Sequence, residues 1–152
     1  MPQTDSRLLQ CIVFQLGAEW FAVPIAQMRG IERWRPPTPV PGTPPAILGI
    51  INQRGMLVTV LDIRMLLGQK PEPPTRRTRL LFASAGDTDV ALLADHVADL
   101  LDLDVARAEA PPHRASGFSS GLLHTPFGLA TWLDLGLVLH ALIGSVEGGA
   151  SK

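Results

Sequence analysis

The sequence predicts an all-β protein, built from two small β-barrels that pack together, with a few short helices. Three observations support this prediction. Fourteen prolines and fourteen glycines divide the 152 residues into short segments, which suit strands better than long helices. Apolar and polar residues alternate along several of these segments. The chain also matches itself when it is shifted by 72 positions, so it contains a repeat.

The N-terminal segments have the pattern of a β-hairpin. Residues 9–16 alternate between apolar and polar, and residues 20–23 are expected to return beside them after a turn. Pro24 suits the first position of a helix, so a single helical turn is predicted over 25–28. Residues 30–34 are a further strand candidate, and the proline-rich segment that follows is expected to end it.

A second hairpin is predicted farther along the chain. The apolar runs at 47–51 and 56–61 have the composition of buried strands. Between them, Asn52 and Gly55 tolerate left-handed backbone angles and are predicted to form a tight turn. Such a hairpin would hold Arg54 at its tip, where the side chain is either a solvated surface group or a docking point for a partner.

The shift by 72 positions aligns this hairpin with a later segment. Gly49 falls on Gly121, and Asp62 falls on Asp134, with apolar residues aligned around both pairs. Each copy therefore consists of a strand, a tight turn, a strand and an aspartate. Both aspartates are predicted to cap short amphipathic helices, because an aspartate oxygen accepts hydrogen bonds from the first turn of a helix.

The repeat predicts two related halves of about 70 residues each, and a weaker similarity between 21–28 and 90–97 supports it. One half alone would bury too little surface, so the halves should share one domain. The predicted bounds are 8–143 for the domain, 8–68 and 77–143 for the two barrels, 68–78 for a surface linker, 104–116 for a loop, and 144–152 for a flexible tail.

Composition argues against several classes of protein. A hydrophobic fraction of 46% suits a packed interior, and a net charge of −1 provides no basic field for nucleic acid. The N-terminus lacks a signal-peptide pattern, and no run reaches the ~18 apolar residues of a membrane span. A cytoplasmic protein without membrane insertion is therefore expected. The single cysteine, Cys11, rules out an internal disulfide and should be a small buried side chain.

The sequence shows no catalytic, metal or cofactor site. The histidines have no metal-ligand spacing and are expected to be surface or half-buried residues; they are His96, His113, His124 and His140. Ser119 and Ser120 lack the pattern of a nucleophile elbow. Four acids lack the glycine and glutamate of a calcium loop and should be mostly solvated; they are Asp95, Asp99, Asp102 and Asp104. A small enzyme is thus the least favoured alternative.

Two blocks of the chain read FQLGAEWFAVPIAQM and VPGTPPAILGIINQRGMLVTVLDIRMLLG, and two later ones read VALLADHVADLLDLD and GLLHTPFGLATWLDLGLVL. Together they resemble the CheW-like domain family, the coupling proteins of bacterial chemotaxis. The most specific part is G-x-x-N-x-R-G followed by L-D-I-R. The resemblance covers about residues 8–143 and implies two SH3-like five-stranded barrels.

The resemblance also implies a function. Such a protein is a non-enzymatic adaptor that joins the regulatory domain of a CheA-type histidine kinase to the cytoplasmic tips of methyl-accepting chemoreceptors, at membrane-associated arrays. In this family the arginine of the turn lies beside the receptor-binding groove, which here matches Arg54. Other groove positions match Met28, Ile31 and Gly49, and the kinase-binding face stays unassigned. Coupling in a chemosensory pathway that controls pili or biofilms is the open alternative.

Three positions depart from the pattern of the family. Gln53 stands where an apolar residue is usual, Thr59 where proline is frequent, and Gly30 where an acid is common. The fold does not depend on them, but the missing acid changes the charge around Arg54. An adaptor with two partners should also expose apolar patches, and Met28 and Ile31 are the candidates for one of them.

Overall fold

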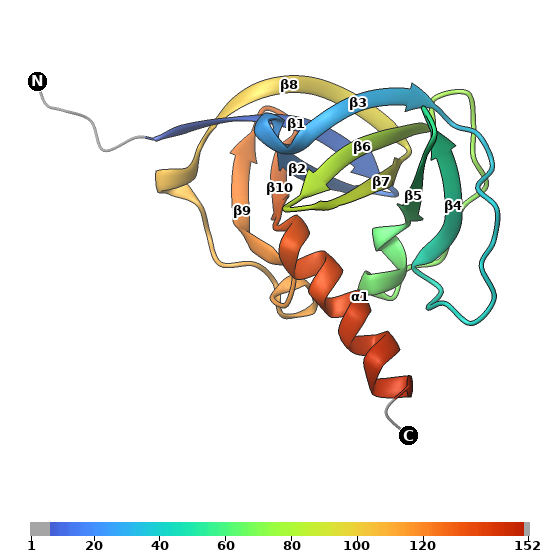
Figure 1. Ribbon diagram of the computed structural model, residues 1–152. Coiled ribbons are helices and arrows are strands. Elements are labelled where there is room, and N and C mark those ends of the chain that lie inside the picture. Colours follow the sequence, from blue (N-terminus) through green and yellow to red (C-terminus); the bar gives the residue numbers. More distant parts are fainter. Residues whose placement is uncertain (1–6, 151–152) are drawn as a thin grey trace, which may run out of the picture.

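The computed structural model describes residues 7–150, with side chains for residues 7–142 (Figure 1). Ten strands form two curved five-stranded sheets, which confirms the all-β prediction. The strands are β1 (Leu8–Leu16), β2 (Glu19–Pro24), β3 (Met28–Arg33), β4 (Ile47–Gln53), β5 (Met56–Leu61), β6 (Arg79–Ala85), β7 (Thr88–Ala94), β8 (His96–Asp104), β9 (Ser119–Thr125) and β10 (Gly128–Leu133). The 3₁₀ helices are η1 (Ile25–Gln27), η2 (Ile63–Leu67), η3 (Val105–Arg107) and η4 (His113–Ala115), and the α-helix is α1 (Leu135–Ala150).

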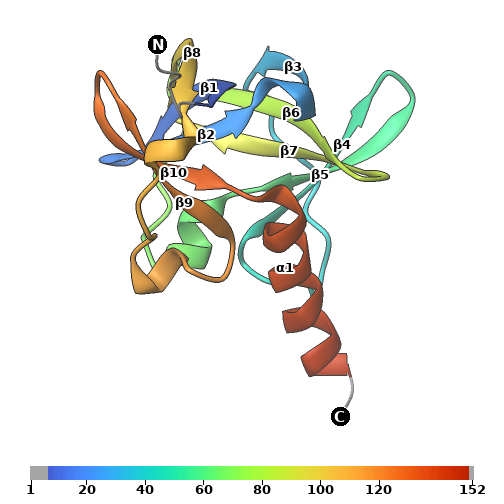
Figure 2. The same ribbon diagram turned by 90° about the vertical axis from the view of Figure 1, so that its left-hand side faces the viewer.

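The two sheets exchange strands between the halves of the chain. Sheet A has the order β8-β1-β2-β10-β9, and sheet B has the order β3-β6-β7-β5-β4. Figures 1 and 2 show the N-terminal strands β1 and β2 beside the C-terminal strands β9 and β10. The predicted assignment of 8–68 to one barrel and 77–143 to the other is therefore wrong. The alternation of apolar residues marks strands, but it does not specify which distant strand becomes the partner.

The repeat is nevertheless present in the fold. Replacing β1–β5 by β6–β10, and the reverse, converts the order of sheet A into that of sheet B. Each sheet has one parallel pair, β2 with β10 and β7 with β5. Each half thus contributes its first two strands to one sheet and its last three to the other, so neither half can complete a barrel by itself.

Buried apolar residues form one shared core and a small cluster in each sheet. The sheet A cluster includes Cys11, Val13, Ala22 and Leu123, and the sheet B cluster includes Leu80, Phe82, Ala91 and Ile51. The largest cluster takes residues from both sheets, and Phe14 and Phe21 stack within it at 5.6 Å between ring centroids. A core shared in this way makes the two barrels one cooperative unit.

Both predicted capping aspartates lie at the starts of helices, but the helices differ. Asp62 Oδ1 accepts a hydrogen bond of 3.1 Å from the backbone N–H of Arg64 in η2, and Asp134 Oδ1 accepts one of 3.1 Å from the N–H of Leu137 in α1. The helix η2 has five residues, whereas α1 has sixteen. The predicted flexible tail is wrong for 144–150, which continue α1, and 151–152 lie outside the described residues.

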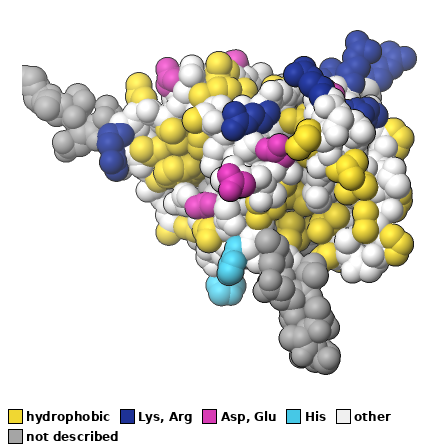
Figure 3. All heavy atoms as spheres, viewed as in Figure 1, with side chains coloured by type: hydrophobic (Ala, Val, Ile, Leu, Met, Phe, Trp, Pro, Cys, Tyr) yellow, Lys and Arg dark blue, Asp and Glu magenta, His cyan; other side chains and the backbone are white. Residues whose placement is uncertain are grey.

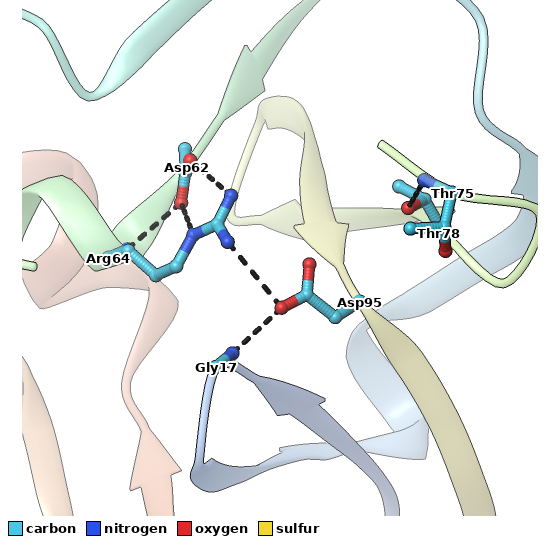
Figure 4. A network of polar contacts seen from close by, with 6 residues as sticks. All are labelled: Gly17, Asp62, Arg64, Thr75, Thr78 and Asp95. Atoms are coloured by element: carbon cyan, nitrogen blue, oxygen red, sulfur yellow. Dashed lines mark hydrogen bonds and ion pairs between the residues drawn. The ribbon is translucent and has the colours of Figure 1, made fainter. Parts of the chain in front are cut away.

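A buried ion pair connects the two sheets (Figure 4). Arg64 and Asp62 are each 1% exposed, and Arg64 Nη2 donates to Asp62 Oδ2 at 2.9 Å. Arg64 Nη1 also reaches Asp95 Oδ2 at 3.5 Å, and that oxygen accepts from the N–H of Gly17 at 2.7 Å. Burial lowers the pKa of Arg64, but the hydrogen bond and charges of its acidic neighbours, including Glu72, outweigh burial and raise it.

This network joins segments that are far apart in the sequence and belong to different sheets. Gly17 belongs to the β1–β2 turn of sheet A, Arg64 follows β5 of sheet B, and Asp95 lies between β7 and β8. Asp99 and Asp102 are exposed, as expected for solvated acids, but Asp95 is half-buried and holds this contact. The arginine and two carboxylates therefore hold the β1–β2 turn against the end of sheet B.

Candidate functional site

The β4–β5 hairpin ends in the two-residue turn Arg54-Gly55, which agrees with the predicted position of the turn. Both residues have positive φ, 53° for Arg54 and 86° for Gly55, as a type I′ turn requires. Asn52 Oδ1 accepts a 2.9 Å hydrogen bond from the N–H of Gly55 and supports the turn. Among the described residues, Arg54 is the only non-glycine with positive φ, a conformation that costs about 1 kcal/mol. The strained turn projects an exposed arginine.

A groove of about 460 Å³ lies between β3 and this hairpin and crosses β6 and β7. Its buried lining residues are apolar, and they are Val58, Phe82, Ala83 and Val90. Two larger apolar side chains line it while exposed to solvent, Ile31 at 44% and Met56 at 63%. Arg54 also lines this β3–β5 groove. The combination of an apolar floor, exposed apolar side chains and a projecting cation suits contact with another protein.

A polar network at the edge of the β3–β5 groove provides hydrogen-bond partners for Gln53. Gln53 Nε2 donates to the carboxylate of Glu32 on β3, and Gln53 Oε1 accepts from Arg35 Nη2 at 2.8 Å. Arg35 Nη1 donates to the carbonyl oxygen of Asn52 at 3.0 Å. These bonds attach the hairpin to β3 and engage the carboxylate of Glu32.

The side chain of Arg54 makes no hydrogen bond or ion pair with any residue in the range 7–142. Gly30, where the family resemblance leads us to expect an acid, also lines the groove, and a Cβ there would meet no atom of the described residues within 4 Å. The missing acid thus leaves open space in the groove, and the guanidinium of Arg54 is available to a partner.

The structure brings two of the four predicted contact residues together. Arg54 and Ile31 line the β3–β5 groove, whereas Met28 is half-buried and packs against the shared core. Gly49 is buried below the segment after β3: a Cβ at this position would lie 2.2 Å from the carbonyl oxygen of Thr38. Contact between a receptor and Met28 or Gly49 stays a prediction, and neither residue lines the groove.

Sequence reasoning missed other residues of the groove. Met56 lies directly after the turn and is exposed. Its position in the sequence could have predicted this, because a strand residue next to a hairpin tip has few neighbours to pack against. Arg29 and Asp89 come from β3 and β7, and both contact Ser84: Arg29 Nε donates to its Oγ at 2.9 Å, and its hydroxyl donates to the carboxylate of Asp89. Their proximity depends on strand pairing and had no local signal.

Comparison with known proteins identifies the family of this chain. Residues 10–142 match the CheW-like domain. The chain belongs to the CheW-like domain family.

Two relatives and one solved structure illustrate the similarity within this family. The chain is 36% identical over 109 residues to a "Chemotaxis protein CheW" of Rhizobium meliloti, covering 72% of this chain and 70% of that protein. It is 34% identical over 118 residues to a "Probable chemotaxis protein CheW" of Rhizobium etli, covering 75% and 76%. The scaffolding protein TtCheW of Thermoanaerobacter tengcongensis superposes with a TM-score of 0.75 at 23% identity, covering 84% of this chain and 89% of TtCheW. The superposition confirms the fold expected of a CheW-like domain.

The remaining polar residues of the described part of the chain form no metal site. Within the described residues, no group of three or more His, Cys, Asp or Glu side chains is arranged to hold a metal ion, and no helix is long and apolar enough to cross a bilayer. Burial and the charge of Arg77 lower the pKa of His96. Cys11 is fully buried, and burial together with the charge of Asp102 raises the pKa of its thiol to about 11. The thiol therefore stays protonated at neutral pH.

Proposed function

We propose that this protein is a non-enzymatic adaptor that couples a CheA-type histidine kinase to methyl-accepting chemoreceptors in chemotaxis. The kinase would bind through its regulatory domain and the receptors through their cytoplasmic tips, so the adaptor would act in the cytoplasm at membrane-associated receptor arrays. Membership of the CheW-like family supports the coupling role. The structural observation that carries the proposal is the β3–β5 groove, where an unpaired arginine projects beside an apolar floor.

The β3–β5 groove suits a helical partner. An amphipathic helix buries its apolar face in such a groove, and Ile31 and Met56 would lose exposed surface when it does. Arg54 can then form forked hydrogen bonds with a carboxylate or with the free carbonyl oxygens at the end of a helix. Gly49 and Met28 would support the site indirectly, because both lie on the strands that frame it.

Charge reversal at Arg54 tests this assignment. Loss of a charge-assisted contact should weaken receptor binding by about 2 kcal/mol, or about thirtyfold, and Arg54→Glu should weaken it further because like charges then meet. Thermal unfolding should stay unchanged, since Arg54 is exposed. Kinase binding should be largely retained, since we place the kinase on another surface. Calorimetric titration with a receptor fragment and with the kinase regulatory domain measures both affinities.

The matched control is Arg107→Glu, which reverses an exposed arginine on η3, away from the β3–β5 groove. It should leave receptor affinity within about twofold of wild type. Equal receptor affinity for Arg54→Glu and wild type at physiological salt would show that Arg54 takes no part in docking.

A pull-down from the native host distinguishes chemotaxis from other chemosensory pathways. The captured kinase and receptors, identified by mass spectrometry, should belong to a motility system if the proposal holds. Capture of a kinase and receptors that control pili or biofilms would support the alternative pathway, with the same coupling mechanism.

A further inference from the structure

Three arginines gather where β3 ends, outside the β3–β5 groove. Arg33 is the last residue of β3, while Arg76 lies in the turn before β6 and Arg79 is the first residue of β6. Figure 3 shows Lys and Arg side chains collected at the edge of the molecule where β3 ends in Figure 1. Within residues 7–142, none of the three forms a salt bridge. This end of sheet B is therefore a strongly basic surface.

The basic surface is hollowed into a cleft of about 410 Å³, which we call the arginine cleft. Its lining residues are Arg33, Trp34, Thr75, Arg76, Thr78 and Arg79. Among residues 7–142, no acidic side chain lines it, although the protein as a whole has a net charge of −1. Residues 28–94 contain nine Lys or Arg and five Asp or Glu. Residues 7–27 and 95–142 together contain three Lys or Arg and seven Asp or Glu. The middle of the chain is therefore basic and the remainder acidic, although the total charge is close to zero.

The arrangement of the arginine cleft is unfavourable for the protein alone. Arg33 and Arg79 are direct partners across the β3–β6 pair. Opposed side chains in such a pair have Cβ atoms ~5 Å apart, and like charges at this distance destabilise the sheet. An anionic partner that lies between the two guanidinium groups would remove this repulsion.

Hydrogen bonds hold the turn of the arginine cleft in place before any partner binds. Thr78 Oγ1 accepts from the N–H of Thr75 at 2.8 Å, and Thr75 Oγ1 accepts from the N–H of Arg77 at 3.1 Å. Arg79 Nη1 donates to the carbonyl oxygens of Arg76 at 2.8 Å and of Thr78 at 2.9 Å. A fixed turn reduces the entropy lost on binding, so the cleft is preorganised for a ligand.

We infer that the arginine cleft binds an acidic, extended segment of a protein partner. Several arginines in one cleft can each form forked hydrogen bonds with a separate carboxylate, which a chain with closely spaced Asp or Glu residues provides. The half-buried Trp34 offers an apolar wall for the methylene groups of such side chains. A concave site fits a peptide chain better than the flat surface of an anionic membrane. The arginine cleft and the β3–β5 groove share no lining residue, so the inference stands or falls independently of receptor coupling.

A fluorescein-labelled decapeptide with six glutamates tests the inference, together with the same peptide carrying glutamine in their place. Fluorescence anisotropy should show binding of the glutamate peptide only, and affinity should fall as salt rises. The double variant Arg33→Ser, Arg76→Ser should bind at least about tenfold more weakly, because two charge-assisted contacts are lost. Arg107→Ser, which removes an exposed arginine elsewhere, should bind like wild type.

Thermal unfolding adds an independent readout. The double variant should unfold at the same temperature as wild type or a higher one, because the repulsion between Arg33 and Arg79 is relieved. Amide shifts in a ¹H–¹⁵N correlation spectrum should localise the bound glutamate peptide to residues 75–79.

Four results would overturn the inference. The first is equal affinity of the glutamate peptide for wild type and the double variant. The second is displacement of the peptide by millimolar inorganic phosphate, which indicates a site for a single anion. The third is stronger, arginine-dependent binding to phosphatidylglycerol vesicles, which indicates a membrane surface. The fourth is salt-sensitive self-association that the double variant abolishes, which makes a second copy of this chain the occupant.

Discussion

The two hairpins that the repeat relates, β4–β5 and β9–β10, have the same length but present different surfaces. The first ends in Arg54-Gly55 and projects an unpaired cation beside an apolar groove. At the corresponding turn of the second hairpin, Phe127 stacks on Trp20 of β2 with 4.8 Å between ring centroids, and Leu129 beside it is 43% exposed. The strand lengths and the pairing register are the same in both hairpins, but the turns differ in backbone as well as in side chains: Arg54 and Gly55 have positive φ in the first, whereas the positive φ of the second lies on Gly128, after Phe127. The repeat therefore specifies a scaffold, and the residues at its tips determine what each barrel can contact.

The interior shows which features of the scaffold are kept. Gly49 and Gly121 have φ of 147° and 148°, and each lies under a segment that crosses its strand. The crossing segments form equivalent bridges, Thr38 with Ile50 and Glu109 with Leu122. The helix caps diverge: position 64 of the first copy is a buried arginine, whereas the matching position 136 is glycine. Within residues 7–142, the ion pair between the sheets therefore comes from the first copy alone.

Of the variants considered for the two helix caps, removal of Arg64 should cause the largest loss in the free energy of unfolding. Arg64→Met leaves Asp62 buried without its partner and should lower the free energy of unfolding by about 3–5 kcal/mol. Urea denaturation measures this loss. The control Arg114→Met breaks the ion pair with Glu19, which is 48% exposed on the arginine side, and should cost less than about 1 kcal/mol. A loss below about 1 kcal/mol for Arg64→Met would show that the ion pair does not hold the sheets together.

The two crossing glycines should differ in their tolerance of a side chain. Gly49→Ala places a Cβ 2.2 Å from the carbonyl oxygen of Thr38 and should cost about 3 kcal/mol through strain and displacement of the crossing segment. Gly121→Ala, with 2.8 Å to the carbonyl oxygen of Glu109, should cost about 1–2 kcal/mol. Equal urea midpoints for these two variants would mean that the two crossings are equally tight in solution.

Alkaline pH should distinguish the two sheet clusters, since sheet A holds Cys11 and sheet B holds Leu80. The folded protein raises the pKa of this thiol from 9.0 to about 11. The contribution of the protonated thiol to the free energy of unfolding is therefore fully present below pH 9. It falls by roughly 2 kcal/mol as the pH rises to about 11. Urea titrations at both ends of this range should show the loss in wild type and not in Cys11→Ala. Identical pH profiles would place the thiol in contact with water.

The smallest expected effect concerns the strain at the tip of the first hairpin. Arg54→Gly removes the cost of positive φ and should raise the free energy of unfolding by about 0.5–1 kcal/mol. Arg54→Ala keeps a Cβ in the same conformation and should leave stability unchanged. Both variants should weaken receptor binding. Greater stability with undiminished binding in Arg54→Gly would separate the strained turn from function.

Sequence alone determined the features that depend on residues close together in the chain. The alternating segments were found as strands, the turn at Arg54-Gly55 was located, and both aspartates were placed at helix starts, because turns and caps form from neighbouring residues. The repeat was visible because similar residues recur 72 positions apart in the sequence. The resemblance pointed to the family, and residues 10–142 matched it.

Only the tertiary structure decided which strands share a barrel. The parallel pairs of β2 with β10 and β7 with β5 join distant segments, and no local period specifies such partners. The same exchange buries Arg64 between two sheets and brings Ile31 and Arg54 to one groove. It also sets Arg33 opposite Arg79. Contacts of this kind depend on the free energy of the whole packed core, which is shared between both halves of the chain.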